Sequence, residues 1–271
     1  MKKKILKYLL AVAASVGFGT MIGATSVSAE TTSVEINSTN FPDMYFREYV
    51  ADVFDTNGDG VLSSEEIEEV TSIECNYTEI KSLEGIKYFT NVTYLDCEDN
   101  VIEKLDLSGC TKLVELMCSE NCIEELNLSG CSNLEYLECD ENYIKELDLS
   151  DCTNLKSLEC CVNYIKELDL SNCTELYYID CTENLLTKLN IKNCKDVTEL
   201  YCYSNKLKEL DVSACVELVE LSCDTNDISK LDVSNCTKLQ KLYCYSNKQV
   251  HCICLHQAHL NYLNNNTTSV T

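Results

Sequence analysis

The chain has 271 residues, of which 45 are Asp or Glu and 21 are Lys or Arg, giving a formal net charge of −24. A protein that binds nucleic acid through phosphate contacts needs a basic face, so this balance excludes that class of partner. Hydrophobic residues make up 45% of the chain, which is enough to bury a core and excludes wholesale disorder despite the charge.

The start of the chain, residues 1–29, predicts a secretory signal peptide. A lysine-rich head precedes an apolar stretch over residues 5–22, and Val27, Ser28 and Ala29 provide a small-residue cleavage site. Loss of its four lysines takes the net charge from −24 to −28. No later apolar run reaches the roughly 18 residues that a membrane-spanning helix needs. We therefore expect a secreted or cell-surface protein with no transmembrane segment after signal cleavage.

Residues 30–72 predict a small helical cap. Residues 43–54 carry apolar side chains at helical spacing behind Pro42, and a second short helix is predicted at about residues 64–70. Because a stack of repeats exposes an apolar end, we expect this segment to cover the first repeat.

Between these two helices, residues 55–66 match an EF-hand calcium loop at every constrained position. Gly60 allows the sharp turn and Leu62 supplies the buried anchor. A turn that keeps the EF-hand shape without binding an ion is the alternative. A lone hand lacks its usual partner hand, so the expected dissociation constant for Ca²⁺ is roughly 10⁻⁴ to 10⁻³ M. The predicted ligands are Asp55, Asn57, Asp59, the Val61 carbonyl, Ser63 through water, and Glu66.

The rest of the chain, residues 73–259, repeats with a period of 21. Cysteines recur at this step from position 97 to 244, asparagines follow three residues behind them from 100 to 247, and a second cysteine column runs from 110 to 236. A unit this short cannot bury its apolar edge alone, so neighbouring units must stack. The alternation in Leu137-Glu138-Cys139 predicts a short strand with one buried face.

These columns set specific expectations for the stack. We expect about eight or nine repeats with one parallel strand each. We expect each asparagine to bind the backbone of its own turn and the asparagine of the neighbouring repeat, since buried amides need partners. After Asn247 the pattern slips by one residue, which puts Val250, Ile253, Leu255 and Ala258 at the buried positions. Residues 260–271 are polar and are expected to be frayed.

The repeat, exemplified by residues 134–152, resembles the bacterial leucine-rich repeat family, with Cys139 where the third leucine of the family pattern would be. This cysteine and the 21-residue period are similar to the cysteine-ladder repeats of internalins. The resemblance covers about residues 73–247. It implies an α/β-type repeat solenoid, a parallel-strand leucine-rich repeat array of about 8–9 units, with a small helical EF-hand-like cap at the N-terminus.

The cysteines have three possible roles: buried packing thiols, disulfides or metal ligands. Stacked strands lie about 4.7–4.9 Å apart with parallel side chains, which suits neither a disulfide nor a tetrahedral metal site, so packing thiols are favoured. Cys75 shares the buried column position. Cys122 and Cys161 lie at variable positions, and we expect them to be exposed, reactive thiols. The histidines and cysteines of residues 251–259 match no standard zinc spacing, and a degenerate last repeat is the simpler interpretation.

No set of catalytic residues stands out, since all three histidines lie at positions 251–259. We therefore predict a protein that is not an enzyme. By its resemblance to internalins, it would be an adhesin-like binding module, monomeric, that recognises a protein or glycan at a cell surface through its concave sheet. The alternative is a structural spacer or surface-array component whose repeats only set length.

The outward strand positions favour the binding module, because they change from carboxylates to tyrosines along the repeats. Tyrosine provides rigid contact area at binding hot spots, and carboxylates steer a basic partner. A plainer explanation is that tyrosine suits strands. The predicted partner-binding residues are Asp96, Glu98, Glu138, Asp140, Tyr178, Asp180, Tyr201, Tyr203, Tyr243 and Tyr245.

Overall fold

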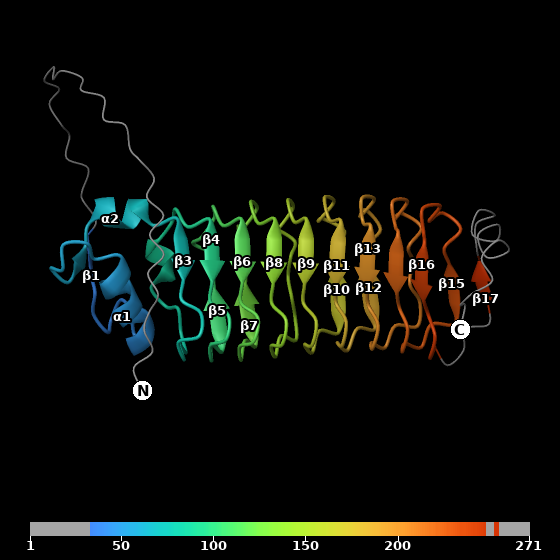
Figure 1. The fold of residues 1–271 in the computed structure, drawn as a ribbon, viewed down its shortest axis with the longest axis horizontal. Helices are drawn as coiled ribbons and strands as arrows, with labels where there is room; N and C mark the ends of the chain where they lie inside the picture. The colour runs from blue at the N-terminus through green and yellow to red at the C-terminus, as the bar shows by residue number, and fades with distance from the viewer. Residues whose placement is uncertain (1–32, 248–251, 255–271) are drawn as a thin grey trace, which may run out of the picture. The chain divides into compact units, whose positions relative to one another are not determined.

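The computed structural model describes residues 33–247 and 252–254, and shows a helical cap followed by a row of stacked repeats (Figure 1). The predicted signal peptide and the polar tail lie outside the described residues. In the cap, strand β1 (Val34–Glu35) pairs antiparallel with β2 (Val61–Leu62), and the helices are α1 (Met44–Val53) and α2 (Ser64–Glu69).

Both cap helices begin where a side chain satisfies free backbone amides. Asp43 Oδ1 accepts from the amides of Tyr45 and Phe46, at 2.9 and 3.0 Å, and caps α1. Ser63 caps α2 in a reciprocal capping box with Glu66. The helices predicted at 43–54 and 64–70 are therefore confirmed to within two residues. Met44 has 51% of its surface exposed, so it does not face the core as its spacing suggested.

The cap packs against the first repeat. The ring centroid of Phe89 lies 6.2 Å from that of Phe41 and 5.1 Å from that of Phe54. Phe89 directly follows a short 3₁₀ helix (Ile86–Tyr88). Asp43 also accepts from the Lys81 amide at 2.9 Å, so the residue that caps α1 ties the cap to the repeat. The apolar end of the stack is covered, as predicted.

The repeats form one sheet of nine parallel strands in chain order (Figure 1). Each strand pairs with the same repeat position of its neighbour, as in Leu116 with Leu137. This register buries one leucine or isoleucine in every strand except the last, where Leu242 is half-buried, and it confirms the predicted stack. The strands are β3 (Ser72–Glu74), β4 (Tyr94–Asp96), β6 (Glu115–Met117), β8 (Tyr136–Glu138), β9 (Ser157–Glu159), β11 (Tyr178–Asp180), β13 (Glu199–Tyr201), β14 (Glu220–Ser222) and β16 (Lys241–Tyr243).

The expectation of a single strand per repeat is wrong. A second short strand follows the ladder asparagine in several repeats, because exposed, buried and exposed residues alternate there. These strands pair in parallel as β5 (Lys104–Asp106) with β7 (Glu125–Asn127), β10 (Glu167–Asp169) with β12 (Lys188–Asn190), and β15 (Lys230–Asp232) with β17 (Cys252–Cys254). Ile253 pairs with Leu231, which confirms the predicted one-residue slip at that position.

The ladder asparagines bond to the backbone of two repeats, and all are buried except Asn205 and Asn247, which are half-buried. Asn142 donates through Nδ2 to the carbonyls of Cys118, Cys139 and Asp140 at 2.9–3.2 Å. Its Oδ1 accepts from the Ile123 amide at 2.9 Å. The predicted bond to the next asparagine is therefore wrong: the backbone of the preceding repeat already takes up the amide.

The residue before each ladder asparagine has a positive φ, which closes the turn in the left-handed region. No glycine occupies this position. Aspartate, glutamate, serine and threonine do so in seven of the eight repeats, and valine does so once. These residues, with φ between 48° and 54°, are Asp99, Glu120, Glu141, Val162, Glu183, Ser204, Thr225 and Ser246.

Candidate functional site

The open face of the nine-stranded sheet, which we call the sheet face, carries the outward side chains of the strands and of the residues just after them. Strand register places Glu138, Glu159 and Asp180 in one row on three successive strands. The same row continues into Tyr201, Ser222 and Tyr243. The predicted carboxylates and tyrosines thus share one surface.

Burial, aided at some positions by repulsion between neighbouring carboxylates, raises the pKa of the acidic groups on the sheet face. Burial, with repulsion from Glu138, Asp140 and Asp180, raises the pKa of Glu159 to about 7. Burial likewise raises the pKa of Glu138, Asp140 and Asp180. Glu159 was not among the residues predicted from the sequence, although it lies one period from both Glu138 and Asp180. The 21-residue period could therefore have predicted Glu159 as a member of this row.

The two other predicted carboxylates lie nearer the cap. Asp96 is buried and accepts from the Asn76 side chain at 2.6 Å. Burial raises the pKa of both Asp96 and Glu98. Met117 separates Asp96 from Glu138 in the strand register, so these two groups sit apart from the central row.

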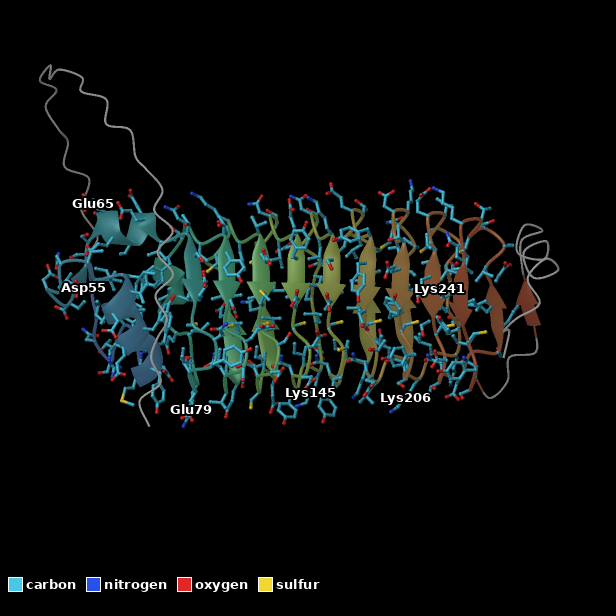
Figure 2. All side chains as sticks on the ribbon, in the orientation of Figure 1. Asp55, Glu65, Glu79, Lys145, Lys206 and Lys241 are labelled. Atoms are coloured by element: carbon cyan, nitrogen blue, oxygen red, sulfur yellow. The ribbon has the colours of Figure 1, made fainter. Side chains whose placement is uncertain are left out.

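No lysine or arginine of the described residues forms an ion pair with the central carboxylates. The ion pairs among the described residues do not reach Glu138, Glu159 or Asp180. Lys241, at the far end of the sheet, pairs with Glu220 at 2.7 Å (Figure 2). The face therefore keeps an uncompensated negative charge that attracts a cationic group.

The tyrosines differ in exposure along the sheet face. Tyr178 and Tyr201 are half-buried and in contact, with ring centroids 5.8 Å apart. The Tyr201 hydroxyl donates to Glu199 at 2.8 Å. Tyr203 is half-buried, whereas Tyr243 and Tyr245 are 43% and 56% exposed.

The EF-hand-like loop at the tip of the cap is held by its own side chains. Asp55 accepts from the amides of Gly58 and Gly60 at 2.8 and 2.9 Å. Asn57 and Asp59 each accept from the amide two residues ahead, at 2.8 and 2.9 Å. Asp55 lies on the cap, away from the repeats (Figure 2). The first three predicted ligands thus follow one another around one turn.

Glu66, the last predicted ligand, is engaged by protein donors. Hydrogen bonds from the Ser63 amide and from the hydroxyl and amide of Thr56 lower the pKa of Glu66 to about 2. The carboxylate is thus ionised at neutral pH. Over residues 33–247 no three acidic, cysteine or histidine side chains already converge as a metal site. The oxygen donors present suit a hard cation such as Ca²⁺.

The cysteines of both columns are buried thiols except Cys244, which is half-buried, and no disulfide joins those within the described residues. Burial raises the pKa of Cys139 well above the ordinary thiol value. Cys75 is 1% exposed, as expected. Cys122 and Cys161 are only half-buried. Burial and a hydrogen bond to Asp140 raise the pKa of Cys161, which disfavours its reactive thiolate form.

No protein-family model matches the chain. Internalin J of Listeria monocytogenes is 37% identical over 68 residues, which are 25% of this chain and 7% of that protein. Among solved structures, internalin C2 of Listeria monocytogenes aligns with a TM-score of 0.62 and 24% identity, over 85% of this chain and all of the other. A leucine-rich repeat protein of Leptospira interrogans aligns with a TM-score of 0.60 and 22% identity, over 66% of this chain and 50% of the other.

These likenesses confirm the fold that the repeat pattern predicted. The chain has a leucine-rich repeat fold like that of internalin C2 and a stretch similar in sequence to internalin J, with a column of mostly buried cysteines along its strands. Of the helices that the structure describes, none has the length and apolar content required to cross a membrane.

Proposed function

We propose that the protein is a secreted or cell-surface binding module that holds a protein or glycan partner on its sheet face. The observation that carries this proposal is the row formed by Glu138, Glu159 and Asp180, which no ion pair among residues 33–247 neutralises. Carboxylates that lie close together repel one another, and a bound cationic group reduces this repulsion. A partner that presents Lys or Arg side chains is therefore the best match.

The tyrosines extend the same face. Tyr178 and Tyr201 provide rigid aromatic area directly beside the carboxylate row, and side chains of this kind dominate binding energy at protein interfaces. Charge would set the rate of association, and the tyrosines would set the lifetime of the complex. A pure spacer has no use for outward residues that differ from one repeat to the next.

The test compares the wild type with the Tyr201→Ala/Tyr243→Ala variant, each immobilised and exposed to host-surface and bacterial-envelope extracts. Proteins identified by mass spectrometry on the wild type should be depleted at least tenfold on the variant, and raised salt should slow their association. A Tyr77→Ala variant, which removes an exposed tyrosine outside the sheet face, is the matched control. Equal capture by all three proteins would reject the sheet face and favour the spacer.

We further propose that the cap loop binds Ca²⁺. Asp55, Asn57, Asp59, the Val61 carbonyl, Ser63 and Glu66 would hold the ion, which would draw their negative charge together and stabilise the loop. The turn formed by Gly58 and Gly60, both at positive φ, supports this assignment. Calorimetry with CaCl₂ should give binding heat for the wild type and for Asp52→Ala, an exposed carboxylate on α1. The heat should be lost in Asp55→Ala. Identical heats for Asp55→Ala and the wild type would reject calcium at this loop.

A further inference from the structure

A second exposed apolar surface lies outside the sheet face, on the turns that contain the ladder asparagines. The residue directly after this asparagine is apolar in five successive repeats. Glu79 and Lys206 occupy the equivalent position at the two ends of this run, and both lie along one edge of the stacked repeats together with Lys145 (Figure 2). We call this surface the turn-edge patch, and it comprises Val101, Cys122, Tyr143, Tyr164 and Leu185, with Val162 beside Tyr164.

The patch is exposed where its side chains are largest. Tyr143 and Tyr164 are 48% and 46% exposed, and Val101 and Val162 are 39% and 41% exposed. Single exposed apolar side chains are ordinary on a protein surface, but a contiguous group is characteristic of an interaction site. The spacing of one repeat between members makes this group contiguous.

The patch is also preorganised. The rings of Tyr143 and Tyr164 stack with centroids 6.0 Å apart and planes 17° apart. Their backbone amides donate to Ile123 and Ile144 at 2.9 Å, which ties each tyrosine to the preceding repeat. A partner would therefore meet rings that are already fixed, and little side-chain entropy would be lost on binding.

Val162 provides an independent indication of function. It has a φ of 52°, a left-handed conformation that is costly for a β-branched residue, and the equivalent positions carry Asp, Glu, Ser or Thr. An exposed valine gains nothing from burial that would offset this strain. Strained residues of this kind gather at functional sites.

The charge around the patch identifies the partner's chemistry. The residues before the ladder asparagines form an exposed acidic row, Asp99, Glu120, Glu141 and Glu183, interrupted only by Val162. None of these four carboxylates takes part in an ion pair of the described residues. A second copy of this chain would bring such rows face to face, and the net charge of −24 also opposes self-association.

We infer that the turn-edge patch docks a protein segment that presents apolar side chains between Lys or Arg residues. The apolar side chains cover the stacked tyrosines and Val162, and the cations meet the acidic row. The stacked tyrosines of this patch are not part of the sheet face, so the inference stands if the sheet-face proposal fails.

The test uses extended peptides of known composition with the full chain, measured by fluorescence anisotropy. An alternating Leu-Lys peptide should bind the wild type at least tenfold more tightly than a Ser-Lys peptide of equal charge. The Tyr143→Ser/Tyr164→Ser variant should lose at least tenfold in affinity for the Leu-Lys peptide. Tyr177→Ser, an exposed tyrosine outside the patch, should bind unchanged.

Charge variants separate the two surfaces. Glu120→Gln/Glu141→Gln should weaken binding of the Leu-Lys peptide severalfold, whereas Glu138→Gln/Glu159→Gln on the sheet face should have a smaller effect. The inference is overturned if the Ser-Lys peptide binds as tightly as the Leu-Lys peptide, or if the double tyrosine variant binds as the wild type does. Sedimentation that detects a dimer abolished by Tyr143→Ser/Tyr164→Ser would assign the patch to self-association instead and overturn it as well.

Discussion

The interior of the repeats and their outer surface follow opposite rules. Inside, the same residue types return every 21 positions: leucine or isoleucine on the strand, cysteine after it and asparagine in the turn. Outside, the residue in one strand row changes from Glu138 and Glu159 to Asp180 and then Tyr201. Packing and hydrogen bonding impose the uniform interior, because each repeat meets an identical neighbour. Nothing in the stacking requires the outer variation, which is where selection for a partner can act.

The strongest way to break this comparison is to remove one interior asparagine. Asn142→Ala removes the side-chain partner of the Ile123 amide and of the Cys118 and Cys139 carbonyls, and we expect the free energy of unfolding to fall by about 3 kcal/mol. Urea denaturation followed by circular dichroism measures the change. Asn154→Ala, at an exposed position of the same repeat, should change stability by less than about 0.5 kcal/mol. Similar losses of stability in both variants would show that the hydrogen bonds of the ladder asparagine do not contribute more to folding than an exposed asparagine does.

A cysteine of the strand column should give an intermediate effect. Cys139→Ala removes one buried sulfur atom and leaves a small cavity, which we expect to cost about 1.5 kcal/mol. Cys161→Ala removes the same atom from a half-buried position, and the loss should be smaller. Urea midpoints of the two variants give the comparison. An equal loss at both positions would contradict the assignment of the column thiols to core packing.

The outer row predicts a dependence on pH that the interior lacks. Because Glu159 has a pKa of about 7 when folded, above the ordinary glutamate value of 4.5, the folded state binds more protons than the unfolded state between these two pH values. The stabilisation from this proton is complete below pH 4.5 and is lost as the pH rises through 7. Glu159→Gln removes this unfavourable charge. The variant should therefore gain stability relative to the wild type as the pH rises from 5 to 8, by about 1 kcal/mol after allowance for solvent screening.

Urea unfolding of the wild type and Glu159→Gln at both pH values measures this difference. Glu167→Gln, on the exposed side of β10, is the control and should show the same pH dependence as the wild type. If the stability of Glu159→Gln and of the wild type changed equally with pH, the raised pKa of Glu159 would be contradicted.

The same comparison explains how much the sequence could predict. The register of the sheet and the buried columns followed from the 21-residue step, because identical units stack in only one way. The same 21-residue step could also have predicted the position of Glu159 in the outer row. The environment of Cys161 was not, because Cys161 donates to the carboxylate of Asp140, one repeat earlier, and this contact depends on side-chain geometry. The partners of Glu66 and the exposure of Met44 likewise depend on how the cap folds back on itself.

The smallest expected effect concerns Val162, where an outer residue conflicts with the backbone of the ladder turn. Asparagine tolerates the left-handed region far better than a β-branched residue, so Val162→Asn should relieve strain and raise the free energy of unfolding by about 0.5 kcal/mol. Val101→Asn, which lies in the same patch at an ordinary φ, should bring no such gain. Thermal and urea denaturation of both variants provide the measurement. A gain at Val162 alone would mean that this chain tolerates a less stable turn while it keeps an apolar side chain at its surface, as a binding role for the turn-edge patch requires. No gain would show that the turn holds valine without strain, and the case for the patch would then depend on the tyrosines.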